Sequence, residues 1–258
     1  MNYPTFDISS KTAVVIGGTS GIGLALAKGL AHAGANVVAT GRRADLVQSV
    51  AAEIKAMGRR TLAPTCDVTD RTSVENLLRT VCAEFGSVDI LVNAAGFTKR
   101  TPTIDVPESE WNNLLETNLN GTLRACQVFG RHMIDRQNGR IINIASLTSF
   151  VSMYEVAAYS ASKAGVASLT KTLAIEWARY GICVNAIAPG VFRTDLNAAL
   201  LDGTARGQEL LMRTPMRRFG KVEELIGAAI FLASDAASFV TGHLLIVDGG
   251  FLASGVNQ

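Results

Sequence analysis

Short apolar runs alternate with longer segments of helical periodicity along the chain. Most of the short runs are continuously apolar, as in parallel strands whose two faces are both covered by helices. Between the first two runs, Ile22, Leu26 and Leu30 recur every four residues and would line one face of a helix, which Gly34 would end. The predicted strands are Thr12–Ile16, Asn36–Thr40, Arg60–Cys66, Val88–Val92, Arg140–Ile144, Ile182–Ala188 and His243–Val247.

Longer segments between these strands have helical periodicity. They are Ala44–Met57, Arg71–Phe85, Glu108–Gln137, Ala157–Tyr180 and Lys221–Leu232. The alternation of strands and helices predicts an α/β fold with a doubly wound parallel sheet of about seven strands flanked by helices. Residues 190–220 resist assignment, and a connection of that length within a compact domain is usually functional.

Composition and charge narrow the class of protein. Of the 258 residues, 48% are hydrophobic and 18% are charged, which is typical of a globular protein with a large core. The net charge of +2 is too small to indicate a nucleic-acid-binding protein. The sequence contains neither a recognisable secretion signal nor a run of about 18 apolar residues, so we expect a cytoplasmic protein without membrane contact.

Cysteine spacing gives no sign of a metal centre. The four cysteines, Cys66, Cys82, Cys126 and Cys183, are scattered along the chain. Neither a zinc site nor a disulfide framework is expected from such spacing. We therefore interpret these residues as small core residues and expect no metal ion.

A glycine-rich segment follows the first predicted strand and opens the first helix. Glycines there would let the backbone turn tightly and approach a pyrophosphate at the amino end of the helix. An ordinary strand–helix turn is the alternative interpretation, but the position directly after the first strand favours a dinucleotide site. The residues expected to contact the cofactor in this segment are Gly17, Thr19, Ser20, Gly21, Ile22 and Gly23.

The end of the second predicted strand indicates which dinucleotide binds. An acidic residue there would accept hydrogen bonds from the ribose of NAD(H), but the sequence has Thr40-Gly41-Arg42-Arg43. Because guanidinium groups bind phosphate through paired hydrogen bonds, Arg42 and Arg43 favour NADP(H). Two solvated arginines at the start of a helix are the alternative, which leaves NAD(H) open.

Three residues are candidates for acid–base chemistry. Tyr159 and Lys163 are four residues apart in a predicted helix and therefore lie on the same face. The pKa of a tyrosine hydroxyl is about 10 in water, and a neighbouring ammonium would lower it toward the range that catalysis needs. Ser146 follows a predicted strand, where its hydroxyl could point into the same cleft.

These motifs, in this order and at this spacing, resemble the short-chain dehydrogenase/reductase family from Gly17 to Gly250. The resemblance implies a single-domain Rossmann fold over residues 1–258 with a substrate-loop insertion at about 190–220. It also implies an enzyme that interconverts an alcohol and a ketone, and a homotetramer. The motifs that carry it are the glycine loop, Asp67, Asn93-Ala94-Ala95-Gly96, Asn118, Ser146, Tyr159, Lys163, and Pro189-Gly190 followed by Thr194.

The resemblance also implies a role for each of these residues. Tyr159 would exchange the proton, Ser146 would polarise the substrate oxygen, and Lys163 would bind the nicotinamide ribose. Asn118 would complete the catalytic set by holding a water that links the lysine to solvent. The further residues implied at the cofactor are Asp67 and Val68 at the adenine, Asn93, Ala94 and Gly96 along the cleft, and Pro189, Gly190 and Thr194 toward the nicotinamide.

The substrate is indicated by cationic residues in the segments expected to line the pocket. Arg100 follows the Asn93–Gly96 motif, and a cationic pocket suits a carboxylate-bearing substrate. Several stretches also resemble the gluconate 5-dehydrogenase and deoxygluconate dehydrogenase branch, so we expect a sugar acid to bind at Arg100, Ser146 and Tyr159. A 3-oxoacyl-carrier-protein reductase is the nearest alternative, and a non-catalytic nucleotide-binding or sensor protein is another.

Overall fold

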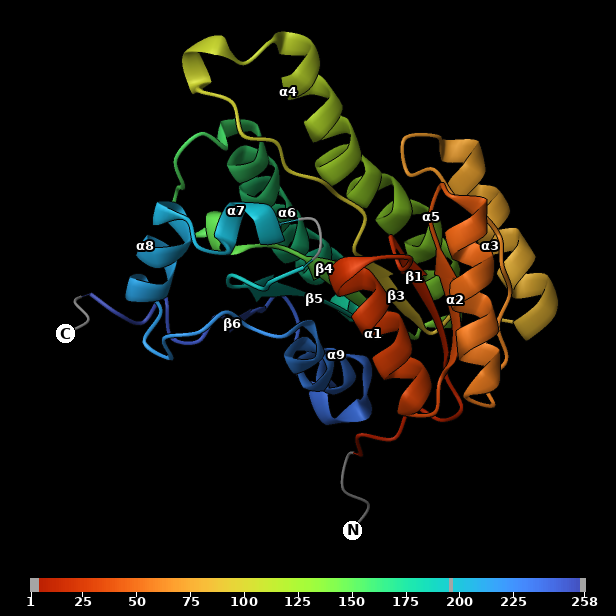
Figure 1. The fold of residues 1–258 in the computed structure, drawn as a ribbon. Helices are drawn as coiled ribbons and strands as arrows, with labels where there is room; N and C mark the ends of the chain where they lie inside the picture. Colours follow the sequence, from red (N-terminus) through yellow and green to blue (C-terminus); the bar gives the residue numbers. More distant parts are fainter. Residues whose placement is uncertain (1–4, 195–196, 256–258) are drawn as a thin grey trace.

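The computed structural model describes residues 5–194 and 197–255, which form one six-stranded parallel sheet (Figure 1). The spatial order is β2-β1-β3-β4-β5-β6, so the chain moves outward from β1 to β2 and then returns to the other side of β1. Ligands in such sheets bind at this reversal, beyond the carboxyl ends of the strands. The strands are β1 (Thr12–Ile16), β2 (Asn36–Thr40), β3 (Ile90–Asn93), β4 (Gly139–Ile144), β5 (Ile182–Pro189) and β6 (Leu244–Val247).

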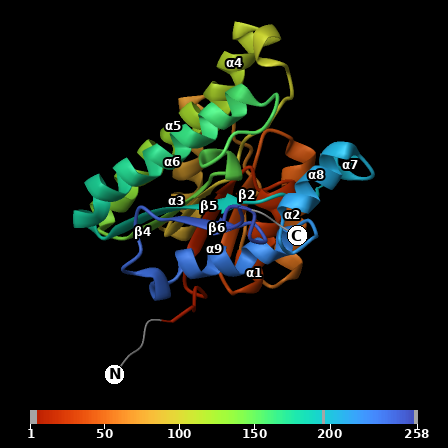
Figure 2. The ribbon, with the colours of Figure 1, turned by 90° about the vertical axis from the view of Figure 1, so that its left-hand side faces the viewer.

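Helices cover both faces of the sheet (Figures 1 and 2). One face packs against α1 (Gly21–His32), α2 (Ala44–Ala56) and α9 (Ile226–Ala233). The other packs against α3 (Arg71–Phe85), α5 (Gly121–Arg136) and α6 (Ala157–Trp177). Strand β1 explains the two layers, because Ala13 and Val15 join the first core while Val14 and Ile16 join the second.

The expected seventh strand is not present among the described residues. Arg60–Cys66 runs beside β2 and bonds to it at its two ends, through the carbonyl of Arg60 and the N–H of Cys66. Between these ends, Pro64 has no N–H to donate, and its carbonyl accepts the Thr40 hydroxyl at 2.6 Å. The prediction of a strand is therefore wrong, because a proline interrupts the ladder.

The predicted helix Glu108–Gln137 exists, but its hydrogen-bond pattern changes in the middle. It consists of α4 (Glu108–Leu115), a π-helical turn η2 (Glu116–Asn120) and α5. Such π turns are frequent at functional sites. In this chain the turn contains Asn118, which is fully buried.

Several 3₁₀ turns adjoin the remaining elements. Helix α6 continues into η4 (Ala178–Tyr180), and α9 is preceded by η5 (Val222–Leu225). The other short turns are η1 (Thr103–Asp105), η3 (Leu147–Ser149) and η6 (Asp235–Ala237). Among the helices of the described ranges, none is both long and apolar enough to cross a membrane.

The segment that resists assignment in the sequence contains two short helices, α7 (Ala198–Leu201) and α8 (Ala205–Arg213). Its base is closed by a parallel bridge between Phe192 and Gly220. A Cβ at Gly220 would lie 2.4 Å from the Phe192 ring, so the close approach depends on glycine. The segment thus returns to the residues directly after β5, from which it starts.

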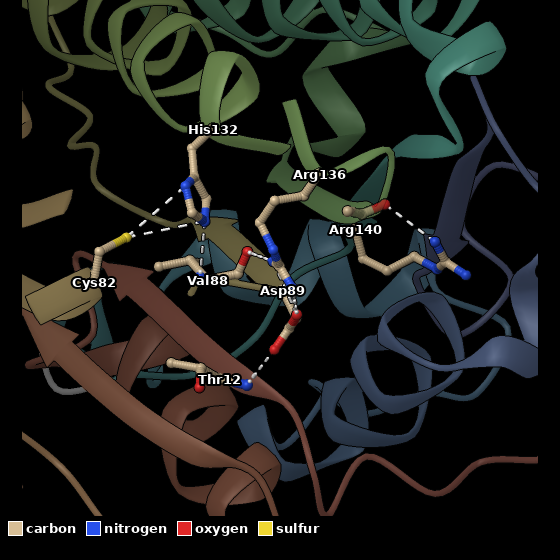
Figure 3. A network of polar contacts seen from close by, with 8 residues as sticks. Thr12, Cys82, Val88, Asp89, His132, Arg136 and Arg140 are labelled. Atoms are coloured by element: carbon tan, nitrogen blue, oxygen red, sulfur yellow. Dashed lines mark hydrogen bonds and ion pairs between the residues drawn. The ribbon is translucent and has the colours of Figure 1, made fainter. Parts of the chain in front are cut away.

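A network of polar side chains closes the amino end of the sheet (Figure 3). The Asp89 carboxylate, directly before β3, accepts the Thr12 N–H at 2.9 Å and two N–H groups of Arg136, each at 3.1 Å. His132, one turn earlier in α5, accepts the Val88 N–H at 3.1 Å. These contacts join β1, β3 and α5 at the end of the sheet opposite the candidate site.

Candidate active site

The predicted site residues lie together because they follow the carboxyl ends of neighbouring parallel strands. The glycine loop follows β1, and Asn93–Gly96 begins at the end of β3. Ser146 follows β4, and Pro189–Gly190 ends β5. The parallel pairing of β1 with β3, β3 with β4 and β4 with β5 places all these segments at one edge of the sheet.

The glycine loop, residues 17–23, forms a tightly packed cradle between β1 and α1. Gly17 has a φ of +81°, and a Cβ there would lie 2.4 Å from the backbone N of Ala95. A Cβ at Gly23, in the first turn of α1, would lie 2.1 Å from the Gly17 carbonyl oxygen. Only glycine fits at these two positions, which lets the loop turn tightly onto the backbone after β3 and bring its N–H groups to the amino end of α1, where a phosphate-bearing ligand could bind.

The other residues of the loop lie at the start of α1 or beside it. Ser20 is the N-cap residue of α1, and Ile22 lies in its first turn. Thr19 is buried, with its hydroxyl 3.1 Å from where a Cβ on Gly41 would lie. A Cβ on Gly21 would lie 3.8 Å from the Thr194 methyl group, so the loop and the start of the substrate segment face each other.

Arg42 and Arg43 are exposed at the end of β2, and Arg43 is the N-cap residue of α2. Asp67 lies near Arg42, and its carboxylate accepts the N–H and the hydroxyl of Thr69 at 2.9 and 2.8 Å. Burial raises the pKa of Asp67, but the Thr69 hydrogen bonds and the charges of Arg42 and Arg124 outweigh it and hold the pKa below its ordinary value. A carboxylate held ionised beside an arginine would be available to an adenine or a ribose.

Val68 is buried against α5 next to Asp67. A Cβ on Gly121 would lie 2.7 Å from a Val68 methyl carbon, and the Arg124 guanidinium donates to the Val68 carbonyl. These contacts fix the turn that carries Asp67.

The Asn93 side chain does not face the glycine loop. Its amide donates to Asn143 at 2.9 Å and to the Cys126 sulfur at 3.3 Å, inside the core between the sheet and α5. The Asn143 amide in turn donates to Thr170 of α6 at 2.9 Å. Asn93 thus stabilises the sheet with its side chain, while Ala94 packs against the position of Gly23.

Ser146 and Tyr159 form the hydroxyl pair of the site. Ser146 lies near enough to Tyr159 to lower the tyrosine's pKa, against the rise that burial causes, and Ser146 Oγ accepts the Thr148 N–H at 3.2 Å. This bond occupies an acceptor site of Ser146 and leaves the serine hydroxyl proton available to Tyr159 or to a substrate oxygen. Ser146 is buried and Tyr159 is half-buried.

Lys163 lies one helical turn beyond Tyr159 and is buried. Its ammonium donates to the Ile144 carbonyl at 2.6 Å and lies 5.7 Å from the centroid of the tyrosine ring. Burial lowers the pKa of Lys163 to about 8. No carboxylate among the described residues forms an ion pair with this ammonium within 4.0 Å.

The pKa of Tyr159 differs from the sequence prediction. The sequence predicts that Lys163 lowers it, whereas in the structure burial raises it and the Ser146 hydrogen bond only partly offsets the rise. The prediction is wrong in direction because desolvation destabilises the phenolate more than its neighbours stabilise it. Tyr159 is therefore held protonated at neutral pH.

Asn118 connects the two sides of the site. Its side-chain amide exchanges two hydrogen bonds with the Phe97 backbone, donating to the carbonyl at 2.9 Å and accepting the N–H at 3.0 Å. It also donates to Ser162 at 3.2 Å, and Ser162 donates to the Tyr159 carbonyl at 2.7 Å. A Cβ on Gly96 would lie 3.0 Å from the Asn118 side-chain oxygen and 3.7 Å from the Lys163 nitrogen, which places Gly96 beside both.

Pro189, Gly190 and Thr194 lead from β5 into the substrate segment. The Gly190 N–H donates to Val247 of β6 at 2.8 Å, and a Cβ on Gly190 would lie 2.6 Å from the Asp248 Cα. Thr194 is half-buried, and its N–H donates to the Asn197 side chain at 2.8 Å. Thr194 thus lies opposite the glycine loop, with its backbone N–H bonded to Asn197.

Arg100 is already paired with a carboxylate. Its guanidinium contacts Glu155, and the side chains are 36% and 21% exposed. Sequence reasoning missed the second cation of this region, Arg206 of α8, which donates to the Tyr154 carbonyl at 3.4 Å. No spacing rule connects Arg206 to Arg100, because α8 reaches this place only through the fold of the 190–220 segment.

Two cavities adjoin the substrate segment. One of about 410 Å³ is lined by Val151, Met212 and Arg213 together with Phe251–Gly255 of the carboxyl-terminal segment. Another of about 250 Å³ lies between residues 191–192, residues 214–224 and the end of β6. Neither is lined by Ser146 or Tyr159, so these cavities border the site and do not contain its chemistry.

Comparison with known proteins gives the family. A model described as enoyl-(acyl carrier protein) reductase matches residues 17–252. Gluconate 5-dehydrogenase of Gluconobacter oxydans (strain 621H) is 41% identical over 98% of this chain and 100% of its own length. An NAD-dependent glycerol dehydrogenase of Listeria innocua serovar 6a is also 41% identical, over 95% of each chain.

Solved structures agree with this fold. A gluconate 5-dehydrogenase from Burkholderia cenocepacia J2315, crystallised in complex with NADP and tartrate, superposes with a TM-score of 0.93 at 41% identity, covering 97% of this chain and 98% of that one. The Rossmann architecture and the dehydrogenase/reductase class expected from the sequence are confirmed. The chain is a member of the short-chain dehydrogenase/reductase family, whose enzymes use NAD(P) and act on CH–OH groups.

Proposed function

We propose that this enzyme is an NADP(H)-dependent oxidoreductase that interconverts a hydroxyl and a keto group on a sugar acid of the gluconate type. The observation that carries the proposal is the hydroxyl pair of Ser146 and Tyr159, with buried Lys163 one turn away. This arrangement lies at the carboxyl edge of the sheet beside the glycine cradle. It combines a proton donor, an oxygen-binding group and a cation at one place.

The cradle fits a dinucleotide, since Gly17 and Gly23 let the loop pack closely on its own backbone and Gly21, beside the amino end of α1, has only the Thr194 methyl group near the place of a Cβ, at 3.8 Å. The glycine loop would hold the pyrophosphate, Asp67 and Val68 the adenine, and Lys163 the nicotinamide ribose. Ala94, Gly96, Pro189, Gly190 and Thr194 would border the remaining length of the cofactor. When bound, the nicotinamide supplies or accepts the hydride, and the protein contributes orientation and charge.

Tyr159 would give its proton to the substrate oxygen during reduction. Its raised pKa keeps the hydroxyl protonated, which suits the role of an acid. Ser146 would donate a hydrogen bond to the same oxygen and stabilise the negative charge that develops there. The Lys163 ammonium would stabilise the phenolate left on Tyr159, and a water held near Asn118 would return the proton from solvent. Oxidation would use the same groups in the reverse order.

Arg42 supports the preference for NADP(H), with Arg43 beside it. Arg42 is exposed at the end of β2 and near Asp67, where a ribose phosphate would meet a guanidinium. Arg42→Ala should raise the KM for NADPH about 10- to 100-fold, as expected for a lost charge-assisted hydrogen bond, and leave the KM for NADH nearly unchanged. Equal increases in the KM for NADPH and the KM for NADH would show that Arg42 does not bind the additional phosphate of NADP(H).

A cationic end of the cleft around Arg100 supports a carboxylate-bearing substrate. The names of the relatives agree with this substrate class in part. One similar enzyme is a gluconate 5-dehydrogenase, whereas another is a glycerol dehydrogenase, whose named substrate has no carboxylate. The Burkholderia cenocepacia gluconate 5-dehydrogenase was crystallised in complex with tartrate, a hydroxylated dicarboxylate. A 3-oxoacyl-carrier-protein reductase would use the same chemistry but would need basic residues outside the cleft for an acidic carrier protein.

Substrate choice is tested by following NADPH consumption with three ketones. The panel is 5-ketogluconate, an uncharged ketose and an acetoacetyl thioester. Reduction of 5-ketogluconate with the highest kcat/KM is the expected result. Faster reduction of the thioester would instead indicate an enzyme of fatty-acid synthesis. Faster reduction of the uncharged ketose would indicate an enzyme that acts on neutral polyols.

We further propose that the enzyme assembles as a homotetramer. Ile175 on the outer face of α6 is 81% exposed, and Phe239 is fully exposed. Large apolar side chains in such positions often mark surfaces that other chains cover. Light scattering coupled to size exclusion should give the mass of four chains, and Ile175→Glu should reduce it; a monomeric wild-type protein would contradict the assembly.

A further inference from the structure

Glu155 links the Arg100 segment to the helix that carries Tyr159. Its backbone has a φ of +65°, in the left-handed region that is strained for a residue with a side chain. The Glu155 carbonyl accepts the Thr101 N–H at 2.9 Å, and its carboxylate pairs with Arg100. Two contacts of Glu155 therefore hold residues 100–101 against the loop that leads into α6, the helix that carries Tyr159.

Arg206 approaches the same place from the substrate segment. It lies in the first turn of α8, and its guanidinium donates to the carbonyl of Tyr154, directly before Glu155. The contact distance of 3.4 Å is at the long limit for a hydrogen bond. The guanidinium has five N–H groups arranged for a planar anion, and this contact uses one of them weakly.

The charged side chains around residues 154–155 carry a net positive charge. Arg100, Glu155 and Arg206 sum to +1, the Glu155 carboxylate is in direct contact with Arg100, and the nearby Glu209 is paired with Arg213. Burial and the neighbouring charge of Arg100 lower the pKa of Arg206, and Glu155 and Glu209 oppose this only in part. The positive end of the α8 dipole adds to the same potential. An anion bound here would relieve the repulsion between the two guanidinium groups.

We infer that Arg206 is the residue that binds the substrate carboxylate, while Glu155 holds Arg100 in place beside it. This deepens the proposed function and rests on a carboxylate-bearing substrate. Arg100 contributes positive potential, but its charge is already met by Glu155, so Arg206 makes the stronger contact. The carboxylate would be held near residues 154–155 and the reacting carbonyl at Ser146 and Tyr159, which fixes the substrate at both ends.

Arg206→Gln tests the inference, with Arg79→Gln as the matched control because Arg79 is an exposed arginine on α3. For 5-ketogluconate, Arg206→Gln should lower kcat/KM about 10- to 100-fold, mainly through KM, as expected for a lost charge-assisted hydrogen bond. The affinity for NADPH and the turnover of an uncharged ketose should stay unchanged. Arg206→Lys should restore part of the loss, because it keeps the charge but not the planar fork.

Glu155→Gln should change the affinity for anions in the opposite direction to Arg206→Gln, which a merely structural role of Glu155 would not do. Removing the competing carboxylate should free Arg100 and tighten the binding of anions two- to tenfold, on the order expected for one partly exposed ion pair. Tartrate binding to the NADP⁺-loaded protein, measured by calorimetry, reads this directly without turnover. Weaker tartrate binding by Glu155→Gln would contradict the arrangement.

The tartrate measurement also separates this inference from the proposed function. If the wild-type enzyme does not reduce 5-ketogluconate but binds tartrate more tightly than Arg206→Gln does, the carboxylate site stands and the substrate assignment fails. If the wild-type enzyme reduces 5-ketogluconate and Arg206→Gln matches it in KM and tartrate affinity, the inference is overturned and the function stands. Failure of the wild-type protein to bind tartrate overturns the inference as well.

Discussion

The two ends of the sheet treat buried polar groups in opposite ways. At the amino end, the Asp89 carboxylate has both a backbone N–H and the Arg136 guanidinium as partners, and His132 accepts the Val88 N–H. At the carboxyl end, the buried Lys163 ammonium donates to one backbone carbonyl, and its pKa falls to about 8. Buried polar groups that have charged or hydrogen-bonding partners stabilise the fold. A buried charge without a counter-ion lowers the stability but is available for chemistry.

Tyr159→Phe should produce the largest effect and act on the carboxyl end alone. Loss of the hydroxyl removes the proton donor, and general acid catalysis contributes about 10²- to 10⁴-fold to a rate. We expect kcat for 5-ketogluconate reduction to fall by that factor while the melting temperature and the NADPH affinity stay within error of the wild type. A variant that keeps more than a tenth of the activity would exclude Tyr159 as the acid.

Asp89→Ala should act on the amino end alone. It leaves the Thr12 N–H and the Arg136 guanidinium without their acceptor, which should lower the free energy of unfolding by about 2–4 kcal/mol. Urea denaturation measures the loss. Activity at a temperature where the variant is folded should match the wild type, and Asp89→Asn should lose less because an amide oxygen can still accept the Thr12 N–H.

His132 should give the smallest effect, visible as a pH dependence of stability. Burial and the charge of Arg136 lower its pKa below 6.5, with Asp89 and Asp135 opposing them. The unfolded chain therefore binds more protons below about pH 6.5, and the stability should decrease as the pH falls through that value toward the folded pKa. The decrease should be small, because His132 is only partly buried, and it should be reduced in His132→Gln; an unchanged pH dependence in the variant would assign the decrease to other groups.

The sequence predicts the parts of the site whose geometry follows from local spacing. The glycine loop after β1 and the four-residue spacing of Tyr159 and Lys163 fix their neighbours once the strands are parallel. Features that depend on the folded surroundings are not predictable in this way. The rise in the pKa of Tyr159 comes from burial, the Asn93 side chain turns into the core, and Arg206 reaches Tyr154 across a separate segment.

The same distinction applies to the fold. Apolar runs predict five strands nearly at their observed bounds and the last, β6, within one residue at its start. Arg60–Cys66 has a strand-like composition, but Pro64 removes a donor at the edge of the sheet. The π turn at Glu116–Asn120 is likewise not predicted, because a single turn with i→i+5 hydrogen bonds is too short to give a periodic pattern of its own.

The free energy of unfolding of Lys163→Met as a function of pH tests the contrast between the two ends most directly. Burial of the wild-type ammonium lowers its pKa from 10.5 to about 8, so the folded protein carries a penalty below pH 8 that disappears as the pH rises toward 10.5. At pH 7 the variant should be more stable than the wild type by about 1–3 kcal/mol, part of the gain being offset by the lost bond to the Ile144 carbonyl, and it should have no measurable activity. The difference in stability should shrink between pH 8 and 10.5. A variant less stable than the wild type at pH 7, by as much as Asp89→Ala, would show that Lys163 fastens the fold and would contradict the account.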